Sequence, residues 1–318
     1  MASTERQKGL LQFLQQSPTP FHAVANMAML LDEAGFQRLD SSNSWNLDKN
    51  SRYYVCRNDS ALIAFKTGAA DLPDSGFRIA GAHTDSPCLK IKPHADVSNQ
   101  GYAQLGVEVY GGALLHPWFD RDLSIAGRVN YQNDDGSLSS ILVDLKDPVA
   151  FIPSLAIHLD RTANKGRVID KQKELPPILL QLDADEKFNF EDYLLEYLHK
   201  DMGCLYASAI LSHELLLYDT QAPALIGLRK QFISSARLDN LLSCFVALHS
   251  LIECKDDTAS VLVCNDHEEV GSMSALGAEG PFLKSVLQRM LEAEGKADGC
   301  SAASFDRAIQ NSVLLSVD

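Results

Sequence analysis

The chain has 318 residues, 46% of them hydrophobic and 22% charged, which is typical of a globular protein with room for two domains. Its formal net charge of -14 argues against nucleic acid and anionic membranes as partners, because both attract basic surfaces. Seven scattered cysteines without a C-x-x-C pair, a polar N-terminus and no long apolar run indicate a cytoplasmic protein with reduced thiols.

Two helices are expected at the start of the chain. Residues 4–16 carry apolar side chains at helical spacing, and Ser3 or Thr4 is the expected N-cap. After a proline-containing break, residues 21–35 form the second expected helix, which ends at Gly35 because glycine commonly terminates helices.

A hairpin and a buried strand come next. The segment RYYVCRNDSALIAFK predicts two strands that turn at Asn58 and Asp59. The apolar segment 77–82 predicts a further strand, which runs directly into His83 and Asp85.

The middle of the chain, residues 92–235, consists of short β-like runs separated by turns. Asp135–Gly136 marks a hairpin, and one helix is expected over 190–199. We interpret this part as a β-rich domain inserted into an α/β domain that is made from residues 1–91 and 236–318.

The last part of the chain returns to alternating helices and strands. A helix is expected from near Asp239, followed by a strand over 261–264, a helix over 281–294 and a final strand that runs into Asp318. The expected buried face of the first of these helices consists of Leu241, Leu242, Phe245, Val246 and Leu248.

Ionisable residues gather where the predicted strands end. Ligands of open α/β sheets bind beyond the carboxyl ends of the strands, so these side chains are expected to converge. Buried carboxylates are costly unless a cation compensates them, which predicts divalent metal ions and proton transfer at this place. The residues concerned are His83, Asp85, Glu268, Glu269 and Asp318, together with Asp239 at a helix start.

Other catalytic motifs do not fit. HEEVG and SHELLLYD lack the second histidine of H-E-x-x-H, and neither a G-x-S-x-G elbow nor a Walker A loop occurs. Taken alone, His83 would be a structural histidine and the Glu268–Glu269 pair a solvated loop. The residues interpreted as structural or solvent-facing are His94, His116, His213, His249 and His267, with Asp120 and Asp122 supporting the insert.

Four segments in order, GAHTDSP, HPWFDRDLSIAGRV, SSARLDN and NDHEEVGS, resemble the M18 family of zinc aminopeptidases, of the aspartyl aminopeptidase type. The resemblance runs from the N-terminal helices to the last residue. It implies an α/β fold with a mixed-sheet metallopeptidase core, helices on both faces and a β-rich inserted dimerisation domain. It also implies peptide substrates and a homo-oligomer that is built through the insert.

The same resemblance implies a role for each site residue. Two zinc ions are expected, and their ligands would be His83, Asp239, Glu269 and Asp318, with Asp239 bridging both ions. Asp85 would orient His83, as carboxylates commonly do for a ligating imidazole, and Glu268 would be the general base. His158, in the string AIHL, would bind substrate in a neighbouring subunit's active site.

Members of the family continue beyond the position of Asp318 and supply a further histidine to the second zinc. The 318 residues are therefore expected to hold at most one zinc, weakly, and to be a poor peptidase. An acidic N-terminal residue is the substrate that the family name suggests, and Lys90 and Lys92 are the nearest basic candidates in the sequence.

Three functions stay open from the sequence. A dizinc aminopeptidase is preferred. A related co-catalytic carboxypeptidase or deacylase would use similar metal ligands but needs a basic group for the substrate carboxylate, so aminoacyl and N-acyl substrates separate the two. An inactive assembly protein is the third, although each ligand expected within the chain is present.

Overall fold

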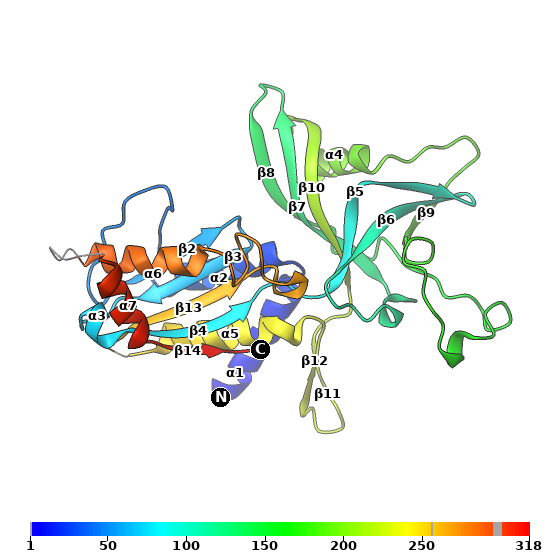
Figure 1. Cartoon of the computed structure of the whole chain (residues 1–318). Helices are drawn as coiled ribbons and strands as arrows, with labels where there is room; N and C mark the ends of the chain where they lie inside the picture. The colour runs from blue at the N-terminus through cyan, green and yellow to red at the C-terminus, as the bar shows by residue number, and fades with distance from the viewer. Residues whose placement is uncertain (1, 256, 295–300) are drawn as a thin grey trace. The chain divides into compact units, whose positions relative to one another are not determined.

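The computed structural model describes residues 2–255, 257–294 and 301–318, and the chain forms two compact units. Residues 1–86 and 223–318 form the first unit, and residues 87–222 form the second (Figure 1). No helix in these described ranges is long and apolar enough to cross a membrane.

The first unit contains a six-stranded mixed sheet in the order β1-β2-β3-β13-β4-β14. Strand β4 pairs in parallel with both β13 and β14, whereas β3 is antiparallel to both β2 and β13. The carboxyl ends of β4, β13 and β14 therefore lie at one edge of the sheet. The strands are β1 (Gln37–Arg38), β2 (Arg52–Arg57), β3 (Ala61–Lys66), β4 (Phe77–His83), β13 (Ala259–Asn265) and β14 (Val313–Ser316).

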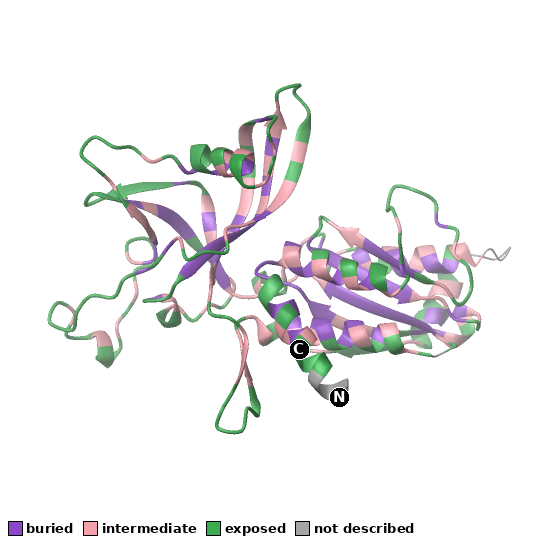
Figure 2. Cartoon of the chain, turned by 180° about the vertical axis from the view of Figure 1, so that it is seen from behind, coloured by how far each residue is buried: buried purple, intermediate pink, exposed green. Residues whose placement is uncertain are grey.

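Helices cover both faces of this sheet, which confirms the predicted α/β class. One face packs against α1 (Ala2–Gln16), α2 (Pro20–Glu33) and α5 (Leu238–Glu253). The opposite face packs against α3 (Leu72–Ser75), α6 (Phe282–Ala293) and α7 (Ala302–Gln310). Figure 2 shows the central strands between these layers as buried.

The alternation of side chains along β13 produces these two cores. Leu262 and Cys264 face the first helix layer, whereas Val261 and Val263 face the second. All four are at most 2% exposed. Burying such an aliphatic side chain stabilises the fold by roughly 1.5–3 kcal/mol, so this strand is fixed between the layers.

Both N-terminal helices are confirmed, but the predicted cap of the first is wrong. Helix α1 begins at Ala2, so Ser3 and Thr4 lie inside it and neither precedes the helix. The cap of α2 is Thr19, whose hydroxyl accepts the N–H of His22. Proline at the first helical position suits this start, because its missing N–H has no helical partner there.

The predicted hairpin between β2 and β3 is also confirmed. Asn58 and Asp59 adopt φ angles of 53° and 55°. Arg57 pairs with Ala61, so the loop between the strands has three residues, 58–60. Asn and Asp tolerate the left-handed conformation of its first two positions better than most residues.

The predicted buried face of α5 needs one correction. Leu241, Phe245 and Leu248 are buried as expected, but Val246 is 53% exposed. At about 100° per residue, position 246 lies on the opposite side of the helix from position 244, which is buried and is occupied by Cys244.

The second unit is built around a six-stranded antiparallel sheet in the order β8-β7-β10-β5-β6-β9. Helix α4 (Phe190–Lys200), which was expected, packs Phe190, Leu194 and Leu198 into its core. The expected hairpin turn contains Gly136 at φ 82°. The strands are β5 (Cys88–Asn99), β6 (Tyr102–Tyr110), β7 (Leu123–Asn133), β8 (Leu138–Asp144), β9 (Ile178–Gln181) and β10 (Ala207–Asp219).

The boundaries of the second unit differ from those expected at residues 92 and 235. It starts at Pro87, just before β5. It ends at Ala222, so the short hairpin of β11 (Ala224–Ile226) and β12 (Phe232–Ser234) belongs to the first unit.

Candidate metal centre

The carboxyl ends of three parallel strands place ionisable residues at one edge of the first unit. Strand β4 ends at His83, and β14 is followed by Asp318. Strand β13 leads into the one-turn helix η3 (Glu268–Val270). Helix α5 adds Asp239 in its first turn. The predicted convergence of these elements is therefore present in the fold (Figure 1).

His83 is the centre of this cluster. Its side chain is 5% exposed, and its Nε2 atom lies 3.3 Å from Asp239 Oδ1 and 3.4 Å from Asp318 Oδ1. One ligand atom from each of the three residues lies within 4.8 Å of the others. The Glu268 Oε2 atom is 3.9 Å from the same imidazole nitrogen. An imidazole and two carboxylates at this spacing are donors that could hold a metal ion.

The surroundings of His83 assign its tautomer. Its Nδ1 atom lies 3.0 Å from the main-chain oxygen of Asp85 and 3.3 Å from Asp85 Oδ1. Both neighbours are acceptors, so Nδ1 carries the proton. The lone pair of a neutral imidazole is then on Nε2, the atom that faces Asp239 and Asp318, as a metal ligand requires.

The charges in the cluster favour a bound cation. Burial alone lowers the pKa of His83, but the hydrogen bonds and charge of Asp85 and the charge of Glu268 outweigh burial and raise it to about 9. Burial and the charges of Asp85 and Asp239 raise the pKa of Glu269. A divalent ion would neutralise the negative charge of these crowded carboxylates and take the place of the proton that the imidazole attracts. The residues therefore fit a metal site.

Asp85 connects the imidazole to the loop after β13. Its side chain is 1% exposed, and its two oxygens accept the main-chain N–H groups of Glu268 at 3.2 Å and Glu269 at 3.1 Å. The same carboxylate therefore contacts His83 and fixes the start of η3. Hydrogen bonds between a buried carboxylate and backbone N–H groups are among the stronger ones in proteins.

A second set of hydrogen bonds fixes the loop on both sides of the Glu268–Glu269 pair in the sequence. Asp266 Oδ1 accepts the N–H of His267, whose φ of 66° lies in the left-handed region. The His267 ring contacts the Ser274 hydroxyl at 2.7 Å, and that hydroxyl also accepts the N–H of Gly277 at 3.1 Å. His267 thus has the structural position that the sequence suggested for it.

The remaining predicted site residues lie in different surroundings. Glu268 has a side chain that is 46% exposed, so it is accessible to solvent. Glu269 is not in the group of three potential ligands found among the described residues, although the charges that raise its pKa include Asp239. His158 is exposed in a turn of the second unit.

One buried residue of the site was missed from the sequence. Asn240 is 1% exposed and hydrogen-bonds to His83, Val317 and Asp318. The available signal was its spacing: it lies four residues before Cys244, in line with the apolar positions of the expected buried face, where a polar side chain needs partners.

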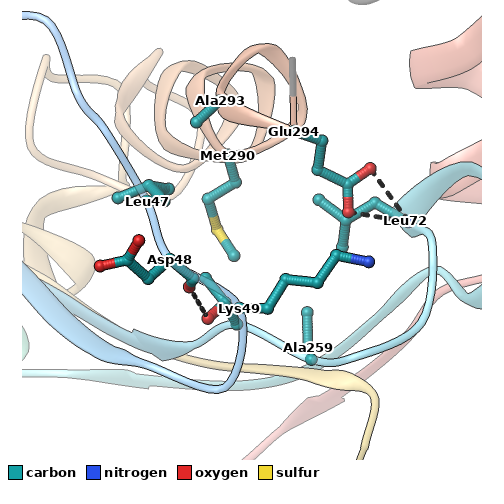
Figure 3. Close-up of a pocket in the computed structure, with 10 residues that line it drawn as sticks. Leu47, Asp48, Lys49, Leu72, Ala259, Met290, Ala293 and Glu294 are labelled. Atoms are coloured by element: carbon teal, nitrogen blue, oxygen red, sulfur yellow. Dashed lines mark hydrogen bonds between the residues drawn. The ribbon is translucent and has the colours of Figure 1, made fainter. Parts of the chain in front are cut away.

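A separate pocket in the first unit is drawn in Figure 3. It is lined by Met290 and by Ala259, the first residue of β13, so it lies away from the strand ends that carry the metal-binding candidates. Its polar groups are bonded within the protein: Lys49 Nζ donates to Ala69 O at 3.0 Å, and Glu294 accepts the N–H of Leu72 at 3.2 Å. We therefore place the candidate site at His83.

Comparison with known proteins identifies the family of the chain. The family model "Aminopeptidase I zinc metalloprotease (M18)" matches residues 13–318. The chain is 54% identical over 311 residues to "Probable M18 family aminopeptidase 2" of Pseudomonas fluorescens, a match covering 98% of this chain and 70% of the relative.

Two solved structures have similar folds. A cryo-EM structure of the Ape4 and Nbr1 complex matches with a TM-score of 0.91 and 36% identity, covering all of this chain and 64% of that chain. The structure of the S. cerevisiae mApe1 dodecamer matches with a TM-score of 0.80 and 28% identity, covering 96% of this chain and 70% of that chain.

Proposed function

Because this chain belongs to the M18 family of zinc metalloprotease aminopeptidases, we propose that it is a zinc-dependent enzyme that removes the N-terminal residue from peptides. The observation that carries the proposal is the position of His83 Nε2, 3.3 Å from Asp239 Oδ1 and 3.4 Å from Asp318 Oδ1. These residues come from three different elements and offer the donors that zinc prefers.

His83, Asp239 and Asp318 are the residues that would hold a first zinc ion, and Glu269 would join Asp239 at a second. Bound zinc would supply Lewis-acid chemistry, lowering the pKa of a water molecule and polarising the substrate carbonyl. Asp85 keeps the proton of His83 on Nδ1 and thereby keeps Nε2 available as a ligand.

Glu268 is the residue that moves the proton. Its Oε2 atom lies 3.9 Å from His83 Nε2, beside the proposed metal ligands, and its side chain is accessible to substrate. We assign it to take a proton from the attacking water and to deliver a proton to the leaving amine. Adjacent glutamates divide these tasks, because Glu269 is assigned to metal binding and Glu268 is left free for proton transfer.

The proposed assembly is a homo-oligomer formed through the second unit, with His158 contributing to the site of a neighbouring subunit. The exposed turn around His158 is flanked by Leu155, Ile157 and Leu159, which are 58%, 49% and 75% exposed. Apolar side chains gathered around one exposed histidine suit a protein interface. The mApe1 structure, which is similar in fold, is a dodecamer.

A substrate panel with metal analysis tests the proposed function. The zinc-loaded protein, extended through the further histidine that members of the family supply to the second zinc, should release N-terminal residues from free peptides and leave N-acetylated peptides intact, and peptides beginning with Asp or Glu should be preferred to those beginning with Leu. The 318 residues alone should turn over the same peptides more slowly. Cleavage of N-acyl or C-terminal bonds instead would favour a deacylase or carboxypeptidase. Absence of turnover by the extended protein with zinc bound would contradict the proposal.

A further inference from the structure

We propose that Asn240 is a positioning residue that sets the geometry of the zinc site by joining its ligands from the inside of the fold. This inference rests on the proposed function, since it concerns the same site. Asn240 directly follows Asp239 in the chain, and its side-chain amide reaches the elements that carry His83 and Asp318.

The amide of Asn240 bonds to both neighbouring strand ends. Its Oδ1 atom accepts the main-chain N–H of His83 at 3.1 Å. Its Nδ2 group donates to Val317 O at 3.0 Å and to Asp318 Oδ1 at 3.1 Å. One side chain thus joins the end of β4 to the segment after β14, while its own backbone fixes the position of Asp239.

The hydrogen-bond partners determine which way the amide points. A flipped amide would turn its N–H groups toward the N–H of His83 and its oxygen toward two acceptors. All three contacts would be lost at a residue that is 1% exposed, where water cannot replace them. Only an asparagine in this orientation can make all three hydrogen bonds. An aspartate of the same shape has no N–H group to donate to Val317 O and Asp318 Oδ1.

The next turn of α5 strengthens the attachment to His83. Cys244, which is completely buried, donates its thiol to the main-chain oxygen of His83 at 3.0 Å. The start of α5 therefore bonds both the N–H and the C=O of His83, through Asn240, whose backbone angles are not helical, and through Cys244 four residues later. The imidazole projects from a backbone that is held on both sides, which limits how far Nε2 can move.

The contact with Asp318 acts on the atom that faces the imidazole. Asp318 Oδ1 receives the Asn240 hydrogen bond and is also the atom 3.4 Å from His83 Nε2. Asn240 is 1% exposed, so a buried side chain orients this carboxylate oxygen.

The substitution Asn240→Asp tests this inference while preserving size. The new carboxylate can still accept the N–H of His83 but cannot donate to Val317 O or Asp318 Oδ1. Loss of a residue that orients metal ligands costs about 10–100-fold in metal affinity. We expect a loss in this range when zinc binding is measured by competition with a chromophoric chelator, with the folding of each variant checked by circular dichroism.

The matched control is Asn26→Asp. Asn26 also joins two segments through its amide, because its Nδ2 donates to Gln16 O at 2.8 Å and to Ser17 Oγ at 3.0 Å, but it is not part of the zinc site. The zinc affinity of the Asn26→Asp variant should stay within about twofold of the zinc affinity of the unsubstituted protein. Zinc affinity of Asn240→Asp within the same range, or an equal loss in both variants, would overturn the inference.

Hydrogen exchange of the zinc-free protein provides a readout that does not need the metal. Val317 N donates to Gly81 O at 2.8 Å, so its amide reports on how firmly this segment is attached. Exchange in peptides covering 313–318 should become faster in Asn240→Asp and stay unchanged in Asn26→Asp. Should Asn240→Asp fail to fold, Asn240→Ala replaces it without adding charge.

The two readouts separate the possible failures. If the unchanged protein binds no zinc, the proposed function fails, while faster exchange at 313–318 in the variant still supports the role of Asn240 in joining these elements. Unchanged exchange in that segment overturns the inference whatever the protein does with zinc.

Discussion

The Asp85 carboxylate accepts the main-chain N–H of Glu269 at 3.1 Å while its other oxygen lies 3.3 Å from His83 Nδ1. A single buried side chain therefore links a residue at the end of β4 to the loop that follows β13. The imidazole and the glutamate pair are positioned together, so a change at Asp85 affects both.

Asp85→Asn should destabilise the zinc-free protein by on the order of 2 kcal/mol, because hydrogen bonds to charged groups contribute roughly 1.5–3 kcal/mol each. The amide can accept one N–H of the loop but turns its own N–H toward the other. Urea unfolding measures the change. Asp40→Asn is the control: Asp40 accepts the N–H of Ser42 at an exposed position, so its substitution should leave the free energy of unfolding almost unchanged. Equal losses in both variants would contradict this account of Asp85.

Glu268→Gln should lower kcat by about 10²–10⁴-fold and leave zinc content unchanged, because the amide cannot take up a proton but the assigned metal ligands are intact. Peptide turnover and metal analysis of the same preparation measure both quantities. Glu292→Gln, at an exposed position of α6, should change neither. A Glu268→Gln protein that loses zinc but retains turnover would reverse the assignment of the two adjacent glutamates.

The free energy of unfolding should decrease as the pH falls below about 6.5, in part because of His213. Burial lowers the pKa of His213 from 6.5, with Glu191 raising it and Lys90 lowering it further. Among the described residues, neither ring nitrogen has a hydrogen-bond partner, and the ring lies edge-on to Phe190 at 5.9 Å between centroids. The unfolded chain therefore binds more protons than the folded one in this range, which destabilises the fold as pH falls.

His213→Phe should make the stability less dependent on pH between pH 5 and 7. Urea unfolding at several pH values measures the slope, and NMR titration of the His213 ring should yield a pKa below 6.5. A titration above 6.5, or a slope that is unaffected by the substitution, would contradict this role of burial.

His158→Ala and Glu268→Gln should complement each other if His158 acts in a neighbouring subunit. Each variant alone should have low activity. After subunit exchange, a mixed pair contains one site with an intact His158 and an intact Glu268, and part of the activity should return. Labelled subunits show whether exchange has occurred, and exchange without recovered activity would place His158 in the site of its own chain or outside any site.

The sequence predicted the strand ends well because apolar runs that stop at ionisable residues are a local pattern. His83 and Asp318 meet in the fold because parallel pairing of β4 with β14 aligns the ends of these strands, and Asp239 joins them from the start of α5. The tautomer of His83 could not be predicted, since it depends on a carbonyl and a carboxylate held in the folded state.

Other features depended on three-dimensional contacts. Helix α7 (Ala302–Gln310) was not predicted, because it buries few side chains and its attachment to α3 is a tertiary contact. Val246 was assigned to the core because it is apolar, but helical geometry turns it outward. The role of Asn240 follows from three hydrogen bonds to residues distant in sequence, which no local pattern contains.

The most direct test of the central claim is to locate zinc in crystals of the protein by anomalous diffraction at the zinc edge. We predict a peak bonded to His83 Nε2 and to the carboxylates of Asp239 and Asp318, at distances of about 2.0–2.2 Å. A zinc-saturated crystal with no peak among these three residues, or with zinc bound only by other side chains, would contradict the assignment of this cluster as the metal centre.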